Sequence, residues 1–195
     1  HHATLNPSCY RGDDSNLILQ NLLWVGLQRL ADEKPIPIDS GTSWWIYAPG
    51  QGAKYWEDYA DEGVMGLGWS VLGDLSAYES QEAIAERLRI IDRKPDASFK
   101  NNSLACWQFA NDIREGDVVV AKRGSNEYVG LGIVTSGYRY EAARGDQPNI
   151  RSVNWVRRGS WHDPRDSIVQ KTLTNVTQYS DYVALLRELI LESKA

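Results

Sequence analysis

The chain has 195 residues, of which 42% are hydrophobic and 24% charged, and its formal net charge is −5. This length suits one domain of moderate size, and the composition excludes intrinsic disorder, collagen-like repeats and a disulfide-stapled scaffold. No apolar run approaches membrane-spanning length, so we expect no membrane partner. Because Cys9 and Cys106 are the only cysteines, we expect a cytoplasmic protein in a reducing compartment.

The first 42 residues predict a segment outside the main domain. His1 and His2 are interpreted as the remnant of a purification tag, because no initiator Met precedes them. Apolar residues recur at helical spacing behind Ser15, so residues 15–33 predict an amphipathic helix. The prolines that follow disfavour helix, and residues 3–42 are therefore expected to form an N-terminal helix and a linker arm.

Residues 43–178 predict the main domain, which opens with short elements. The pattern indicates a buried strand at 44–48, a helix at 53–62 closed by Gly63, and a second strand at 64–69. Gly66 and Gly68 interrupt the second strand. The missing side chains at these positions indicate that another group approaches the backbone closely.

Two helices and a run of strands complete the domain. We expect helices at 79–93 and 102–114, strands at 117–122, 128–135 and 153–157, an edge strand at 168–172, and a last helix that Ser180 caps. Gly124 to Asn126 predict a hairpin turn between the first two of these strands. This order predicts an α+β fold: a small mixed or barrel-like β-sheet flanked by helices, with an extra N-terminal helix.

The chain lacks the patterns that catalysis would need. No glycine-rich loop ends in the Gly-Lys-Ser/Thr of a P-loop, and the glycines lack the Rossmann spacing. His162 is the only histidine beyond the tag remnant, and we interpret it as a surface residue. The acidic residues around Asp92 lack the order of a metal-dependent nuclease site. We therefore predict a binding module with no catalytic residue, no metal and no cofactor.

Charge and aromatic residues together favour a nucleic-acid partner. Residues 122–171 carry 9 Lys or Arg against 5 Asp or Glu, whereas the residues before them carry 10 against 18. We predict that the cations of this basic strand face contact phosphates: Lys122, Arg123, Arg139, Arg144, Arg151, Arg157 and Arg158. Tyr138, Tyr140, Trp155 and Trp161 lie among them, and such rings stack on bases. The alternative is an ordinary solvated strand face.

Several segments resemble a known family. They are Trp44 to Gly50, Gly66 to Trp69, Leu72 to Leu75, Ile113 to Ala121, Tyr128 to Val134 and Val153 to Trp155. These segments, which lie within residues 43–180, resemble EVE-like domains of the PUA superfamily, in particular the N-terminal specificity modules of McrB-type restriction GTPases. The resemblance implies a module that holds a modified base, flipped out of duplex DNA, in an aromatic pocket on a small barrel.

The resemblance also implies partners. In the restriction proteins a fused AAA+ motor and a separate nuclease subunit perform cleavage. The helix expected at 179–195 would then lead toward a motor domain beyond this chain, through which the nuclease would be engaged. By itself the chain is expected to be the DNA-binding, modified-base-recognising module of a modification-dependent restriction system.

Position by position, the resemblance implies a base pocket. The loop after the first strand matches the family's base-edge-reading loop, and Trp69 matches a wall of the pocket. The predicted pocket residues are Trp45, Tyr47, Ala48, Pro49, Gly50, Gln51, Trp69, Tyr138 and Trp155. Two alternatives stay open: an RNA-binding reader of a modified base on the same fold, and a protein-interaction or small-ligand domain whose tryptophans are only core.

Overall fold

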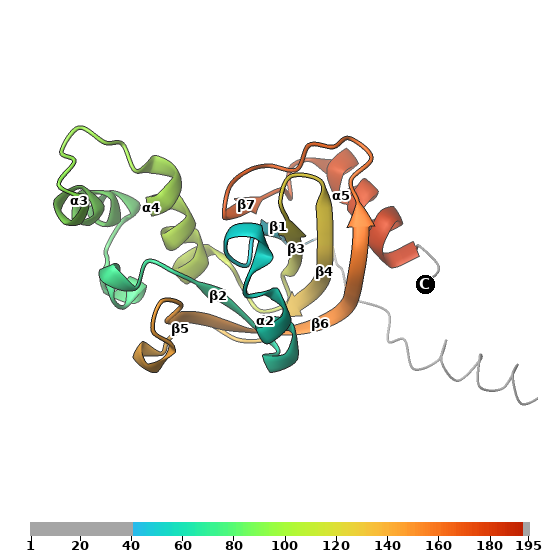
Figure 1. Ribbon diagram of the computed structural model, residues 1–195, viewed down its shortest axis with the longest axis horizontal. Coiled ribbons are helices and arrows are strands. Elements are labelled where there is room, and N and C mark those ends of the chain that lie inside the picture. Colours follow the sequence, from blue (N-terminus) through green and yellow to red (C-terminus); the bar gives the residue numbers. More distant parts are fainter. Residues whose placement is uncertain (1–40, 193–195) are drawn as a thin grey trace, which may run out of the picture. The chain divides into compact units, whose positions relative to one another are not determined.

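The structure is a computed structural model that describes residues 41–192. The helix predicted at 15–33 and the supposed tag remnant lie outside the described residues, as does most of the predicted arm. Within the described part, helices and one curled β-sheet confirm the predicted α+β class and its barrel-like sheet (Figure 1).

The elements follow one another in an order close to the prediction. They are β1 (Trp44–Tyr47), α2 (Trp56–Glu62), β2 (Val64–Leu67), α3 (Gln81–Asp92), α4 (Lys100–Trp107), β3 (Val118–Arg123), β4 (Glu127–Val134), β5 (Arg139–Tyr140), β6 (Asn149–His162), β7 (Leu173–Asn175) and α5 (Ser180–Arg187). A π-helical turn, Gln108–Asp112, continues α4, and another, Glu188–Glu192, continues α5.

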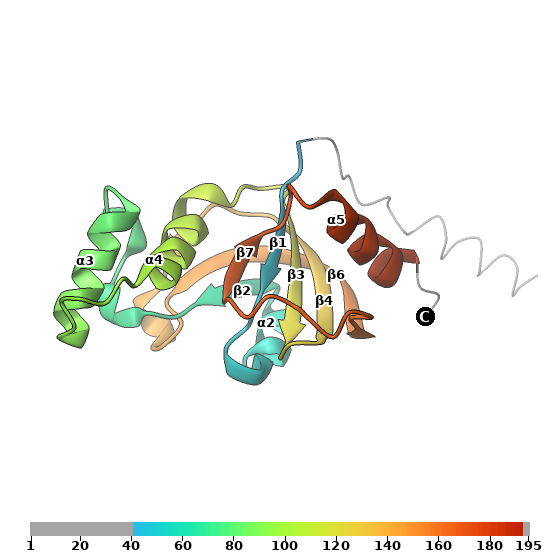
Figure 2. The same cartoon turned by 90° about the horizontal axis from the view of Figure 1, so that it is seen from above.

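The seven strands of the described region form one sheet in the order β2-β6-β4-β3-β1-β7, with β5 paired to β6. Strand β6 makes the sheet curl. Its residues 149–152 pair with β2 and its residues 153–162 pair with β4, so one long strand belongs to both halves. Figure 2 shows β6 sweeping behind β4, β3 and β1 from the end that pairs with β2.

Strand β1 lies inside the sheet, parallel to β3 and antiparallel to β7, and all four of its side chains are buried. The polar side-chain atoms of Trp45 and Tyr47 are satisfied there, as buried indoles and phenols require. The Trp45 indole N–H donates to Asp117 Oδ2 at 2.9 Å. The Tyr47 hydroxyl donates to the Gly66 carbonyl and accepts from the Gly66 N–H at 3.1 Å. Tyr47 therefore links β1 to β2 across the curled sheet.

Two glycines let α2 pack directly on strand backbone. A Cβ at Gly66 would collide with the Tyr59 hydroxyl, and a Cβ at Gly130 would collide with the Trp56 ring. Tyr59 and Trp56 both come from α2 and are buried. The close approach that the sequence predicted at Gly66 is therefore confirmed, and the approaching group is the protein's own tyrosine.

The predicted helices are confirmed with shifted ends. Ser80 caps α3, since its hydroxyl accepts from the Ala83 N–H at 3.1 Å. The helix ends at Arg93, which adopts the left-handed conformation with φ 55°. The second helix ends its π-helical turn at Asp112, before the predicted end at 114, because Ile113 is already extended.

Three predicted boundaries are wrong. Residues 168–172 form no strand, because β7 pairs with β1 only from Leu173. Ser180 does not cap α5: Tyr179 holds the cap position and Ser180 is the first helical residue. Strand β6 is 14 residues long and begins at Asn149, before the predicted start at 153. The prediction missed its first residues because buried polar side chains there break the apolar alternation of an ordinary strand.

Candidate functional site

The structure does not bring the nine predicted pocket residues together. Trp45, Tyr47 and Trp155 are core residues, with 1%, 0% and 9% of their surface exposed. The Trp155 indole N–H donates to the carbonyls of Tyr59 and Val64 at 3.2 and 3.1 Å. These three rings offer no open face to a base, so their assignment to the pocket is corrected: they were chosen as aromatics near the right motifs, but they fill the inside of the sheet.

Trp69 is different, because its backbone is strained and its ring is only partly buried. It adopts φ 57° and ψ 43°, the left-handed conformation that costs a residue with a Cβ roughly 1–2 kcal/mol. A bulky aromatic there is a genuine outlier. Its indole N–H has no acceptor within residues 41–192. Trp69 therefore lies partly buried against the hydrophobic core, in a conformation that the surrounding structure must enforce.

A buried polar network holds the backbone next to Trp69. Asn149 is fully buried, and its Nδ2 donates to the carbonyls of Leu67 and Gly68 at 3.1 and 2.8 Å. Its Oδ1 accepts from the Tyr138 hydroxyl at 2.7 Å. That hydroxyl also accepts from the Leu75 N–H at 2.9 Å. The chain before and after Trp69 is therefore tied to the same two side chains.

Tyr138 is thus not a pocket wall as predicted; its hydroxyl holds the backbone near Trp69 in place. Its ring packs edge-on against Phe109 with centroids 6.4 Å apart, and burial raises the pKa of its hydroxyl above the ordinary value. Trp155 lies six residues beyond Asn149 on β6, about 20 Å along an extended strand. Of the predicted aromatic walls, Tyr138 is hydrogen-bonded, directly or through Asn149, to the segments on either side of Trp69, whereas Trp155 lies farther along β6.

The loop after β1 forms a second feature, a pocket of ≈ 420 Å³. This volume lies within the range of roughly 300–1,000 Å³ typical of small-molecule sites. The lining residues come from this loop, from the β3–β4 turn and from the segment before β7: Ala48, Gly50, Gln51, Gly52, Lys122, Gly124, Gln170, Lys171 and Thr172. Pro49, the remaining predicted loop residue, is buried beside the pocket and does not line it.

Glycine is needed to shape this loop. Gly50 has φ 77° and ψ 176°, a conformation open only to glycine, and a Cβ there would lie 2.7 Å from the Tyr55 ring. Gly52 has φ 62°. The Ala48 N–H donates to the Thr172 carbonyl at 2.9 Å, which ties the loop to the segment before β7. These bonds and dihedral angles define the turn that contributes Ala48, Gly50, Gln51 and Gly52 to the lining of the pocket.

Lys122, one of the predicted phosphate contacts, is the buried charged residue of this pocket, and Lys171 is the exposed one. It is 5% exposed, and its Nζ donates to the Gly124 carbonyl at 2.9 Å. No carboxylate of residues 41–192 forms an ion pair with it. Burial lowers the pKa of the Lys122 ammonium below its ordinary value. The side chain is therefore a desolvated cation without a counter-ion among the described residues.

Arg151, predicted to contact phosphate, is a structural residue instead. It is 2% exposed, and burial lowers its pKa to about 10. The guanidinium donates to the carbonyls of Phe109, Ala110 and Ser136 at 2.7, 3.0 and 3.2 Å. Its donors are used to join the π-helical turn after α4 to β6, so this prediction is wrong.

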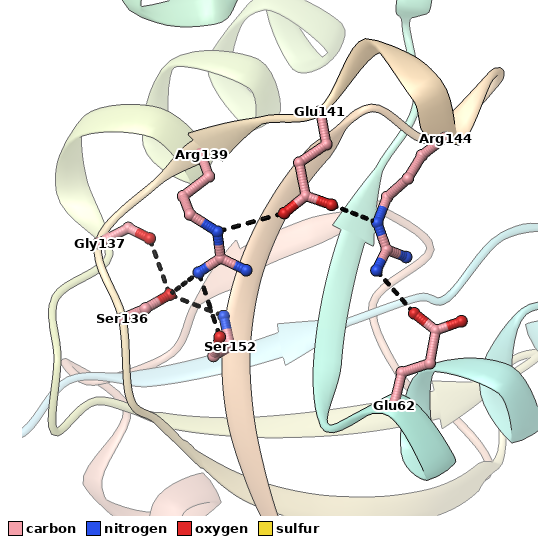
Figure 3. Close-up of polar contacts among 7 residues, drawn as sticks. All are labelled: Glu62, Ser136, Gly137, Arg139, Glu141, Arg144 and Ser152. Atoms are coloured by element: carbon pink, nitrogen blue, oxygen red, sulfur yellow. Dashed lines mark hydrogen bonds and ion pairs between the residues drawn. The ribbon is translucent and has the colours of Figure 1, made fainter.

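Four further arginines of the predicted face are paired with carboxylates. Arg123 lies 3.4 Å from Glu127 and 3.7 Å from Glu57, and Arg158 lies 2.8 Å from Asp61. Figure 3 shows the other two arginines in one chain of contacts: Glu62, Arg144, Glu141 and Arg139. Glu57, Asp61 and Glu62 all come from α2, so an acidic helix neutralises the basic strand face.

The network in Figure 3 also holds the backbone of β5. Arg144 lies 2.7 Å from both Glu62 and Glu141, and its hydrogen bond lowers the pKa of Glu141. Arg139 donates to the hydroxyls of Ser136 and Ser152 at 2.9 and 3.1 Å. Arg157, the last predicted contact, is half-buried and donates to the Val156 carbonyl at 3.3 Å.

Other parts of the described chain fit simpler roles. His162 is exposed and lies 2.9 Å from Asp166, in keeping with a surface histidine. Residues 41–192 contain no cluster of His, Cys, Asp or Glu that could hold a metal ion. Among the same residues, no helix combines the length and apolar character needed to cross a bilayer.

Sequence reasoning missed several residues of both features. Asn149 was not among the predicted site residues, and only its pairing with β2 places it next to Leu67 and Gly68. Gln170 and Lys171 fell within a predicted edge strand, so their position at the pocket was hidden. One feature of the sequence could have indicated the pocket: Gly124 follows Lys122 by two residues. A tight turn there brings the Gly124 carbonyl back to the Lys122 ammonium.

Comparison with known proteins adds a family. A model described as a domain of unknown function (DUF8426) matches residues 45–180. The comparison with curated proteins found no match. Among solved structures, the X-ray structure of an Agrobacterium tumefaciens protein from a structural genomics programme is 16% identical, with a TM-score of 0.38, and the match covers 75% of this chain and 92% of that one.

Proposed function

We propose that this chain binds nucleic acid and holds one unstacked base against Trp69. The chain belongs to the DUF8426 family of domains of unknown function. The expected substrate is DNA with a modified base, flipped out of the duplex. The chain would supply recognition, and any cleavage would be performed by a nuclease subunit and a motor domain that this chain does not contain.

The observation that carries this proposal is the conformation of Trp69. Strained backbone persists only where the surrounding structure enforces it, and it is frequent at functional sites. Here Asn149 and Tyr138 enforce it from a buried network, at a point where a glycine or asparagine would relieve the strain. Trp69 packs partly against the core, stays partly exposed, and has an indole N–H that is unused within the described residues.

Gln147 supplies a polar group next to Gly68, the residue before Trp69. Its Oε1 accepts from the Tyr59 hydroxyl at 3.1 Å, which fixes the amide. Its Nε2 would lie 3.0 Å from a Cβ at Gly68, the residue before Trp69, and donates to no group of the described chain. Side-chain amides read base edges through such donors. An aromatic face and a fixed amide donor are the two contacts that an extruded base needs.

Electrostatics sets a limit on affinity. Each neutralised phosphate contributes about 0.9 to the slope of log affinity against log salt. Since most arginines of the strand face are already paired with carboxylates, few cations remain for phosphates. We therefore expect a shallow salt slope, of about 2 or less, and an affinity that depends strongly on the base contact.

The proposal is tested with Trp69→Ala, Trp69→Gly and the control Trp107→Ala, which removes another partly buried tryptophan from an ordinary helical backbone. Fluorescence anisotropy measures binding to duplexes with and without one modified base, and to matched RNA. Loss of base stacking worth about 1–3 kcal/mol should weaken binding to the preferred ligand by roughly 5- to 150-fold in both Trp69 variants. The control should bind as the wild type does.

Thermal unfolding separates stacking from folding in the same variants. Glycine tolerates φ 57°, so Trp69→Gly should be more stable than Trp69→Ala by about 1 kcal/mol. Equal binding by wild type and both Trp69 variants would refute the base contact. A preference for RNA would favour the alternative of an RNA-binding reader. No binding to any oligonucleotide would refute the proposal and favour a protein-interaction or small-ligand domain.

A further inference from the structure

The pocket after β1 gathers hydrogen-bond donors and no acidic side chain. Its lining includes the ammonium groups of Lys122 and Lys171 and the side-chain amides of Gln51 and Gln170. No Asp or Glu is among the lining residues. The paired arginines of the strand face differ, because each of them forms an ion pair with a carboxylate. The pocket therefore differs from the strand face in holding positive charge with no carboxylate among its lining residues.

Lys122 is the main reason to expect an anion in the pocket, because its buried ammonium has hydrogen-bond donors that no described residue uses. An ammonium has three N–H donors, and the described chain supplies one acceptor, the Gly124 carbonyl. A buried charge without a counter-ion is costly. The register of β3 and β4 shifts between Ala121 and Lys122, so the strand is irregular where the lysine meets the pocket. Such irregularities re-aim side chains and are common beside binding sites.

The loop adds backbone donors on the same pocket. Gly50, Gly52 and Ala53 all have positive φ, which turns successive peptide groups in ways that a helix or strand does not allow. The N–H groups of Gln51 and Gly52 donate to no acceptor within the described residues. Loops with left-handed residues and unpaired successive N–H groups form concavities that bind anions.

We infer that this pocket binds a phosphate group. Lys122 neutralises its charge from inside, the N–H groups of Gln51 and Gly52 donate to its oxygens, and Lys171 contributes from the exposed rim. The phosphate could be carried by a nucleic acid or by a small phosphorylated compound, and the pocket chemistry is the same for both. The inference does not depend on Trp69 and stands apart from the proposed function.

The test follows the backbone amides of the full chain by ¹H–¹⁵N NMR during titration with inorganic phosphate. We expect saturable shifts at Gln51 and Gly52. Lys122→Met, which keeps the length of the side chain and removes its charge, should weaken phosphate binding at least tenfold. The matched control is Lys54→Met, since Lys54 is exposed, follows the same loop and does not line the pocket. It should change affinity less than twofold.

A second variant protects the test against a folding defect. Lys171 is exposed, so Lys171→Gln should leave the spectrum intact and weaken phosphate binding about threefold. Trp69→Ala should leave the phosphate shifts unchanged, which separates this inference from the base contact. Absence of saturable shifts with phosphate, shifts reproduced by chloride at equal ionic strength, or unchanged affinity in Lys122→Met with a native-like spectrum would overturn the inference.

Two further arms identify the source of the phosphate. One uses a single-stranded oligonucleotide with and without a 5′-phosphate, and the other a nucleoside monophosphate. Shifts of Gln51 and Gly52 that the oligonucleotide causes and Lys122→Met abolishes assign the pocket to nucleic-acid phosphate. Shifts caused by the monophosphate alone assign it to a small phosphorylated compound. Either result supports a phosphate site.

Discussion

The basic strand face and the pocket after β1 contain the same kind of residue and have opposite properties. On the strand face, Arg123, Arg144 and Arg158 meet carboxylates of α2. In the pocket, Lys122 is buried with one carbonyl partner and no carboxylate. The segment that looks most basic in the sequence is therefore largely neutralised in the fold, and the availability of a cation depends on what the neighbouring helix brings to it.

Arg151 tests the structural side of this comparison with the largest expected effect. Arg151→Met would leave one buried and two partly buried carbonyls without this donor, and each unsatisfied buried group costs about 1–3 kcal/mol. We expect a loss of about 3 kcal/mol or more in the free energy of unfolding, measured by urea denaturation. The control Arg139→Met removes an exposed arginine and should cost about 1 kcal/mol or less. Similar losses in both would mean that Arg151 is no more structural than the face around it.

Asp163 tests how much a partly buried ion pair contributes to stability, since it pairs with Arg165 near α5. The Asp163 side chain is fully buried and accepts from Arg165, which lowers its pKa to about 2, and from the Tyr128 hydroxyl. Because the folded pKa lies below the unfolded value of about 3.9, this stabilisation is present above pH 4 and is lost as the pH falls toward 2. It should amount to about 2 kcal/mol, and Asp163→Asn should remove most of that pH dependence. Parallel acid-unfolding curves for the two proteins would refute this assignment.

Glu62 tests the neutral character of the strand face with the smallest effect on stability. Glu62→Gln removes one partner of Arg144 and should change the free energy of unfolding by about 1 kcal/mol or less. It should also free positive charge, so affinity for DNA should rise about two- to threefold, with a steeper salt slope. Glu86→Gln, on the distant α3, controls for the change in net charge. Equal affinity of Glu62→Gln and wild type would mean that the face does not approach the phosphates.

Much of the fold followed from the sequence because its signals are local. The apolar run of β1 and the turn at Gly124 each depend on a few neighbouring residues, and both are confirmed. The length of β6 could not be predicted in the same way. Its early residues include the buried Asn149 and Arg151, whose partners are distant in sequence, so no periodicity marks them as strand.

The candidate site was only partly predictable for the same reason. Trp69 stands out in the sequence because glycines precede it, but its left-handed backbone is set by Asn149, 80 residues later. Similarly, the charge of residues 122–171 gave no sign that α2 would supply the counter-ions. Pairing between distant elements decided which aromatic and basic residues remained available to a ligand.

The most direct test of the central claim is a photo-crosslink between nucleic acid and Trp69. An oligonucleotide carrying 5-iodocytosine at the target position would be irradiated with the wild-type protein, and the adduct located by tandem mass spectrometry within the tryptic peptide 55–87. We predict the adduct on Trp69 and not on Trp56, which is buried in the same peptide. Adducts confined to the exposed Tyr140 or to other positions on the strand face, with none on Trp69, would contradict the account.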